Sequence, residues 1–94
     1  MPLSGIRIVD LTRILAGPFC TMMLADMGAE VIKVEAPGVG DPLRQQGVIR
    51  DGLSWYFAAF NRNKRSLSLN LRSEEGRAVL ARLIAAGDVL VENF

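Results

Sequence analysis

Short apolar runs alternate with segments of helical periodicity along the whole chain. Four runs have the β-branched or alternating apolar residues expected of strands: residues 6–10, 29–35, 65–71 and 88–92. The first run is apolar enough to be buried on both faces of a sheet. Because helical segments separate these runs, we predict an α/β fold in which helices cover a parallel sheet.

The two longer helices have recognisable ends. Pro18 suits the first turn of one helix, because proline presets φ and lacks an N–H that would be unpaired there, and Gly28 ends this helix. Ser73 is a suitable N-cap for the other helix, which Gly87 ends. We expect each helix to bury one apolar stripe, with Cys20 as a small buried hydrophobic residue. The stripes are Cys20, Met23, Leu24 and Met27 in the first helix, and Val79, Leu80, Leu83 and Ile84 in the second.

The segment between the second and third runs has weaker signals. Residues 37–42 have the composition of a loop, and the chain looks irregular as far as Asp51. Ser54 suits the cap of a short aromatic helix, although the density of aromatic residues also fits a strand. The aromatic residues of this segment are Trp55, Tyr56, Phe57 and Phe60, and at this spacing they favour a core or a subunit interface over the wall of an acyl pocket. A polar turn is expected at residues 61–64.

The order of the strands places the expected ligand site. Right-handed crossovers give the order 3-2-1-4, numbered along the chain, in a Rossmann-like three-layer sheet that is incomplete at its C-terminus. Ligands of such sheets bind beyond the carboxyl ends of the strands, where the strand order reverses. That point lies between the first and fourth strands. The segments that converge there, and predict a nucleotide crevice, are residues 11–17, 35–40, 69–72 and 93–94.

Charge and residue content exclude several classes of function. Eleven Lys and Arg against ten Asp and Glu leave a net charge of +1, so we expect neither a nucleic-acid nor a membrane partner. One cysteine and no histidine remove the usual zinc sites, an internal disulfide and any histidine-dependent triad. We therefore expect no metal. The chain start lacks the pattern of a signal peptide, and no apolar run has the length of a membrane span, so we expect a cytoplasmic protein.

Three features are candidates for binding an anion or a nucleotide. Residues 16–18 read Ala-Gly-Pro at a helix start, where free N–H groups favour a phosphate and Gly17 permits close approach, but a tight strand-to-helix connection explains them equally well. Residues 61–66 hold three cations that could pair with a phosphate, although a solvated turn is favoured. Glu35 stands where an NAD-binding protein places its ribose-binding acid, yet no G-x-G-x-x-G fingerprint follows the first strand.

Six segments, in this order, resemble the N-terminal region of the family III CoA-transferases. That family includes formyl-CoA, carnitine-CoA and bile-acid-CoA transferases and the α-methylacyl-CoA racemases. The segments are L-x-G-I-R-I-V-D-L-T-R, A-G-P-F, L-A-D-M-G-A-E-V-I-K-V-E-x-P, G-D-P-L-R, N-R-N-K-R-S-L-x-L-N-L and A-G-D-V-L-V-E-N-F. The resemblance covers essentially the whole chain. It implies that residues 1–94 are the N-terminal part of a CoA-binding Rossmann-like domain.

The resemblance also implies a ligand and the residues that bind it. Coenzyme A or an acyl-CoA is expected as a substrate, with no tightly bound cofactor. Matching positions assign its binding to the strand ends that the topology selects. These positions are Ile14, Leu15, Ala16, Ala36, Leu69, Asn70, Leu71, Arg72, Asn93 and Phe94. Some transferases carry glutamine at the position of Leu15 and arginine at that of Ala36, so a polar role for either is lost here.

The implied reaction needs a residue that this chain does not supply. In the family's transferases an aspartate carboxylate attacks the acyl-CoA thioester, and the reaction passes through anhydride and aspartyl-CoA intermediates to a carboxylic acid acceptor. Nothing here matches that aspartate, so we expect no catalytic residue in residues 1–94 and assign Asp10 to capping backbone amides. An interlocked homodimer is also implied.

Three other functions remain open from the sequence. A racemase of the same family is one, although the long segment between Glu35 and the third strand favours a transferase. An NAD- or flavin-binding oxidoreductase domain is the second. The third is an interaction module, because an isolated four-stranded sheet leaves edges and apolar faces uncovered.

Overall fold

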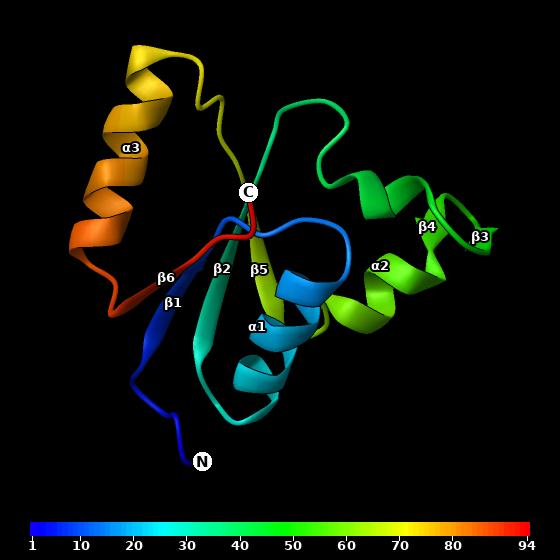
Figure 1. The fold of residues 1–94 in the computed structure, drawn as a ribbon, viewed down its shortest axis with the longest axis horizontal. Helices are drawn as coiled ribbons and strands as arrows, with labels where there is room; N and C mark the ends of the chain where they lie inside the picture. Colours follow the sequence, from blue (N-terminus) through cyan, green and yellow to red (C-terminus); the bar gives the residue numbers. More distant parts are fainter.

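A four-stranded parallel sheet forms the centre of the fold, and helices lie on both of its faces (Figure 1). This computed structural model describes all 94 residues. Along the sheet the strands run in the order β5-β2-β1-β6, and every neighbouring pair is parallel. The predicted α/β fold and the predicted order 3-2-1-4 are therefore confirmed. The strands are β1 (Arg7–Asp10), β2 (Glu30–Glu35), β5 (Lys64–Ser68) and β6 (Val89–Val91).

The two faces of the sheet hold two separate apolar clusters. Ile8 and Val31 face α1 (Ala16–Asp26) with Ala25, whereas Val9 and Val34 face the opposite side with residues of α3 (Glu74–Ala85). Successive side chains of a strand point to opposite faces, so the consecutive residues Ile8 and Val9 belong to different clusters. Figure 1 shows α1 and α3 on opposite sides of the sheet.

The buried face of α1 differs from the predicted stripe. Cys20, Met23 and Met27 are exposed, so the expectation of a buried cysteine is wrong. The helix instead buries Pro18, Thr21, Met22 and Ala25, which repeat at the same helical spacing. The helix is turned in this way because Thr21 hydrogen-bonds to the buried carboxylate of Asp10.

The third predicted strand is shorter than expected, and its last apolar residues serve the other helix. β5 ends at Ser68, and Leu69 donates one more bond, 3.0 Å from its N to the carbonyl oxygen of Glu35. Leu69 and Leu71 then pack in the cluster with Leu80 and Leu83 of α3. The Ser73 cap is confirmed, since its Oγ accepts a hydrogen bond from the Gly76 N–H at 3.0 Å.

The segment between β2 and β5 carries small elements that the sequence did not reveal. A short 3-10 helix, η1 (Pro42–Gln45), is followed by a hairpin of two-residue strands, β3 (Ile49–Arg50) and β4 (Leu53–Ser54). The aromatic helix is confirmed as α2 (Trp55–Phe60), because Ser54 Oγ accepts the Phe57 N–H at 3.2 Å. Strands this short carry no alternation for a sequence pattern to detect.

The aromatic residues of α2 are not core residues of this chain. Trp55 and Tyr56 are each 52% exposed, and Phe60 packs edge-on against the exposed Phe19 at 5.8 Å between ring centroids. They are therefore not part of a core of this chain, and their place in a subunit interface stays a prediction. No helix of the chain has the length and apolar character needed to cross a bilayer.

Gly76→Ala should destabilise the chain, against the usual preference of helices for alanine. Alanine is about 1 kcal/mol better than glycine in a helix interior, but its Cβ here would overlap the carbonyl oxygen of Asn70. The turn at Asn70 would have to move, so we expect a net loss of about 1–3 kcal/mol in the free energy of unfolding, measured by urea denaturation. Ala81→Gly, on the exposed side of α3, is the control and should cost about 1 kcal/mol. A gain in stability from Gly76→Ala would contradict this packing.

Candidate functional site

A cavity of about 650 Å³ opens at the carboxyl ends of β1, β2 and β5. The predicted switch point lies between β1 and β6, and the cavity reaches it only through Phe94, because the rest of its lining follows β1, β2 and β5. The segments that line it are residues 11–13, 34–37, 40–41, 69–72 and Phe94.

A second cavity, of about 450 Å³, lies at the start of α1. Arg13 lines both cavities and is the residue that they share. The lining residues of the second cavity are Arg13, Ile14, Leu15, Ala16, Pro42 and Asn93.

The structure brings all ten predicted site residues to these two cavities. Ala36, Leu69, Asn70, Leu71, Arg72 and Phe94 line the larger cavity, and Ile14, Leu15, Ala16 and Asn93 line the smaller one. Their contact with a ligand stays a prediction. Arg13 was not among the predicted site residues, although it immediately precedes Ile14 in a segment expected to reach the crevice.

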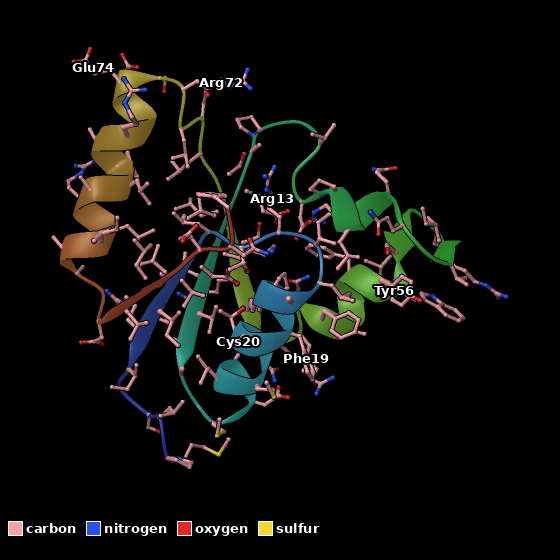
Figure 2. All side chains as sticks on the ribbon, viewed as in Figure 1. Arg13, Phe19, Cys20, Tyr56, Arg72 and Glu74 are labelled. Carbon is pink, nitrogen blue, oxygen red and sulfur yellow. The ribbon has the colours of Figure 1, made fainter.

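Two cations line the larger cavity without a carboxylate partner. Neither Arg13 nor Arg72 forms an ion pair, whereas six other basic side chains of the chain do. The guanidinium of Arg13 lies 5.7 Å from the centroid of the Phe94 ring. Figure 2 shows Arg13 near the strand ends and Arg72 on the connection that leads to α3. Unpaired guanidinium groups can form charge-assisted, bidentate hydrogen bonds with a phosphate.

Asn93 holds the backbone of Arg13 from the last residues of the chain. Its Oδ1 accepts the Arg13 N–H at 3.1 Å, and its Nδ2 donates to the Arg13 carbonyl at 2.9 Å. Both hydrogen-bonding groups of the amide are therefore used inside the protein. Asn93 would act on a ligand mainly through the position of Arg13.

Asp10 closes the end of β1 with a buried network rather than an exposed reactive carboxylate. Its Oδ1 accepts the Thr12 N–H at 2.8 Å, which confirms the predicted capping role, and its Oδ2 accepts Thr21 Oγ1 at 2.7 Å and lies 3.1 Å from Lys64 Nζ. Burial raises the pKa of Asp10, but the hydrogen bonds from Thr12 and Thr21 and the charge of Lys64 together bring this pKa below its ordinary value. The carboxylate stays ionised and enclosed.

A second buried pair supports the loop that follows β1. Lys33 Nζ lies 2.9 Å from Asp41 Oδ2, and both side chains are 1% exposed. The same Nζ donates to the Thr12 carbonyl at 3.0 Å, while Asp41 Oδ1 accepts the Ile14 N–H at 3.0 Å. Ile14 has a φ of +70°, a region that costs a non-glycine residue about 1–3 kcal/mol.

Glu35 is fully engaged inside the protein and is not free to bind a ribose. Its Oε1 accepts the Asp41 N–H at 2.9 Å and Arg44 Nε at 2.8 Å, and its Oε2 accepts Arg44 Nη2 at 2.7 Å and also bonds to Ser66 Oγ. Burial opposes ionisation, yet the bonds from Arg44, Ser66 and Asp41 lower the pKa of Glu35 to about 2. This engagement counts against the NAD-binding alternative.

The basic residues at 62–65 serve the structure and lie at the amino end of β5, away from the crevice. Lys64 is buried against Asp10, and Arg62 pairs with Asp26 at 2.7 Å. Arg65 is exposed and lies 3.7 Å from Glu30. These ion pairs count against a phosphate site here, and the expected solvated turn is wrong for the buried Lys64.

Gly17 is explained by packing within the chain. A Cβ at this position would overlap the side chain of Thr12, so glycine lets α1 approach the end of β1 closely. The close approach to Thr12 supports the tight strand-to-helix connection as the interpretation of residues 16–18.

Comparison with known proteins identifies the family. Residues 3–94 match the family described as CoA-transferase family III. The chain belongs to this family. It is 52% identical over 94 residues to a succinyl-CoA:glutarate CoA-transferase of Mus musculus, a match that covers 99% of this chain and 22% of that protein. It is 51% identical over 94 residues to a formyl-CoA:oxalate CoA-transferase of Escherichia coli, with 99% and 23% coverage.

A solved structure has the same fold as this member of CoA-transferase family III. A CAIB/BAIF family protein from Brucella suis superimposes with a TM-score of 0.92 at 47% sequence identity. The match covers 100% of this chain and 26% of that one. The chain therefore spans about a quarter of the length of the relatives that it matches.

Replacing Glu35 by Gln should remove a pH-dependent part of the stability. A carboxylate whose pKa falls from 4.5 to about 2 on folding stabilises the protein fully above pH 4.5 and loses that effect as the pH falls toward 2. We expect Glu35→Gln to lower the free energy of unfolding by on the order of 2–3 kcal/mol at pH 7. The wild-type and variant curves, measured by urea denaturation from pH 7 to pH 2, should converge at the acidic end. The exposed Glu75→Gln variant is the control and should follow the wild type. Parallel wild-type and Glu35→Gln curves over this range would contradict the assignment.

Proposed function

We propose that this chain forms the first part of an acyl-CoA:carboxylate CoA-transferase and that its crevice holds the CoA part of the substrate. The observation that carries the proposal is the pair of cavities at the carboxyl ends of the strands, with the unpaired cations Arg13 and Arg72 on their lining. Coenzyme A is long, carries a pyrophosphate and a further phosphate, and needs separate polar and apolar contacts. The family membership of the chain supports the same ligand.

The lining offers contacts suited to each part of that ligand. Arg13 and Arg72 supply positive charge for phosphate oxygens, and the first turn of α1 adds backbone N–H groups, because Leu15 caps the helix without a side-chain bond. Phe94 offers an exposed ring for stacking or apolar contact. Ala36 leaves space where a larger residue would fill the rim. We keep Ile14, Leu15, Ala16, Ala36, Leu69, Asn70, Leu71, Arg72, Asn93 and Phe94 as the proposed CoA-binding residues.

The proposed reaction places its nucleophile outside residues 1–94. An aspartate carboxylate attacks the thioester carbonyl, CoA leaves as the thiolate, and an acyl-aspartyl anhydride forms. The thiolate then attacks the aspartyl carbonyl, which releases the first carboxylic acid and leaves an aspartyl-CoA thioester. The acceptor carboxylate repeats these two steps in reverse. In this scheme the present chain binds and orients CoA.

The transferase is preferred to the racemase of the same family. The segment between β2 and β5 is long enough to hold η1, the β3–β4 hairpin and α2, a length expected of the transferases. The donor and acceptor are proposed only as an acyl-CoA and a carboxylic acid, because two relatives of nearly equal identity are named for different acids. We further propose a cytoplasmic enzyme, without a tightly bound cofactor, that works as an interlocked homodimer.

The protein should bind CoA in preference to NAD, since the crevice has unpaired cations but no glycine fingerprint and no free ribose-binding acid. We expect Arg72→Gln to raise the CoA dissociation constant about tenfold or more, measured by calorimetry, because it removes a charge-assisted phosphate contact. Arg65→Gln removes the same charge at the far end of β5 and is the matched control. Binding of NAD without binding of CoA would overturn the proposal.

The 94-residue chain alone should show no CoA transfer and no α-proton exchange. Binding without a reacting group lowers a chemical barrier little, and the matching residues of this chain supply binding surface only. The purified chain is incubated with an acyl-CoA and a panel of carboxylic acids, and new thioesters are followed by mass spectrometry. The longer protein that we propose is the positive control. Turnover by the short chain that disappears on mutation of Asp10 or Asp41 would place the catalytic centre here instead.

A further inference from the structure

Buried side chains form hydrogen bonds to the backbone of the crevice loop, residues 12–14, on both sides of Arg13. The carbonyl before Arg13, that of Thr12, accepts Lys33 Nζ at 3.0 Å. The amide after it, that of Ile14, donates to Asp41 Oδ1 at 3.0 Å. Lys33 Nζ and Asp41 Oδ2 are 2.9 Å apart, so the side chains that make these two hydrogen bonds are themselves joined by an ion pair.

Ile14 needs a stabilising hydrogen bond of this kind to keep its backbone conformation. Its φ of +70° lies in the left-handed region, which a β-branched side chain rarely adopts. Ile14 is also 38% exposed, so packing encloses its side chain only in part. The bond from its N–H to Asp41 is the contact that ties this residue to the sheet.

Asp41 is itself fixed with respect to the sheet. Its backbone N–H donates to Glu35 Oε1 at 2.9 Å, at the end of β2. Its Oδ1 accepts a second amide, that of Leu43, at 2.9 Å, which starts η1. A carboxylate held from the sheet, from η1 and from Lys33 is a rigid acceptor for the Ile14 amide.

We propose that Asp41 is a positioning residue that holds the Thr12–Ile14 loop, and with it Arg13, in the conformation that receives the CoA phosphates. The inference rests on the proposed function for the identity of the ligand. It makes no use of direct contact between Asp41 and CoA. Because the loop is held before the ligand arrives, binding does not have to order it, and the affinity is higher for that reason.

Asparagine at position 41 tests this role with little change of shape. The carboxylate serves Lys33 with one oxygen and the Ile14 and Leu43 amides with the other. An asparagine amide has a single acceptor oxygen, so it can satisfy one side only. Asp41→Asn should therefore release either the Ile14 amide or the Lys33 ammonium group.

Glycine at position 14 separates positioning from general stability. Glycine adopts a positive φ without strain, whereas alanine does not. We expect Asp41→Asn in the longer transferase to raise the CoA dissociation constant about tenfold, in both the wild-type and the Ile14→Ala backgrounds. In the Ile14→Gly background the increase should be less than about threefold. Asp26→Asn, which breaks the ion pair with Arg62 away from the crevice, should change the constant less than twofold.

Hydrogen–deuterium exchange supplies a readout that needs no CoA. Asp41→Asn should speed the exchange of amides 12–14 at least tenfold while the amides of β2 keep the wild-type rate. If the wild type binds no CoA, the proposed function fails and this exchange result still decides the role of Asp41.

The two backgrounds at position 14 also decide the case in which Asp41→Asn impairs folding. If Asp41→Asn yields folded protein in the Ile14→Gly background but not in the Ile14→Ala background, positioning is supported. An equal loss of affinity in the two backgrounds, failure to fold in both, or unchanged exchange at amides 12–14 would overturn it.

Discussion

Two lysine ammonium groups are buried in this chain, and each pairs with an aspartate carboxylate. Lys33 pairs with Asp41 and Lys64 pairs with Asp10, and the four side chains are at most 2% exposed. An unpaired charge at such depth costs several kcal/mol, so these pairings leave little freedom to the backbone around them. They bring the loop after β1, the loop after β2 and the start of β5 to fixed positions relative to one another. The loops after β1 and β2 are two of these segments, and both line the crevice.

The strand order and the convergence of four segments could be predicted because they depend on local patterns and on the handedness of crossovers. The buried face of α1 could not. Residue type favoured Met23 and Met27, but the buried Asp10 carboxylate accepts hydrogen bonds from the hydroxyls of Thr12 and Thr21, and Thr21 lies on α1. The helix turns to satisfy a buried charge and leaves two methionines exposed. A pattern of apolar residues records hydrophobicity and contains no signal for such a demand.

Glu35 and Lys33 show the same limit within a single strand. Both are charged residues in β2, where a sequence pattern assigns polar positions to solvent, yet both are buried. Their partners, Arg44 and Asp41, lie on the loop that follows, whose path no periodicity reveals. For that reason Glu35 was open to interpretation as a ribose-binding acid. In the structure Glu35 binds Arg44 of η1. The guanidinium of Arg44 also lies 3.8 Å from the centroid of the Phe57 ring, so Arg44 connects Glu35 to α2.

The pairing of β1 with β6 has a consequence for the order in which the protein assembles. Ile8 lies opposite Val89, and Asn93 hydrogen-bonds to the backbone of Arg13. One edge of β1 therefore stays unpaired until almost the last residues of this chain are present. While a ribosome is still making the intervening residues, β1 exposes an unpaired edge that can join another strand. Contacts between residues so far apart in the sequence also form slowly. During synthesis, the loop that carries Arg13 can therefore take its final shape only after residue 93 has emerged and α3 has crossed the sheet.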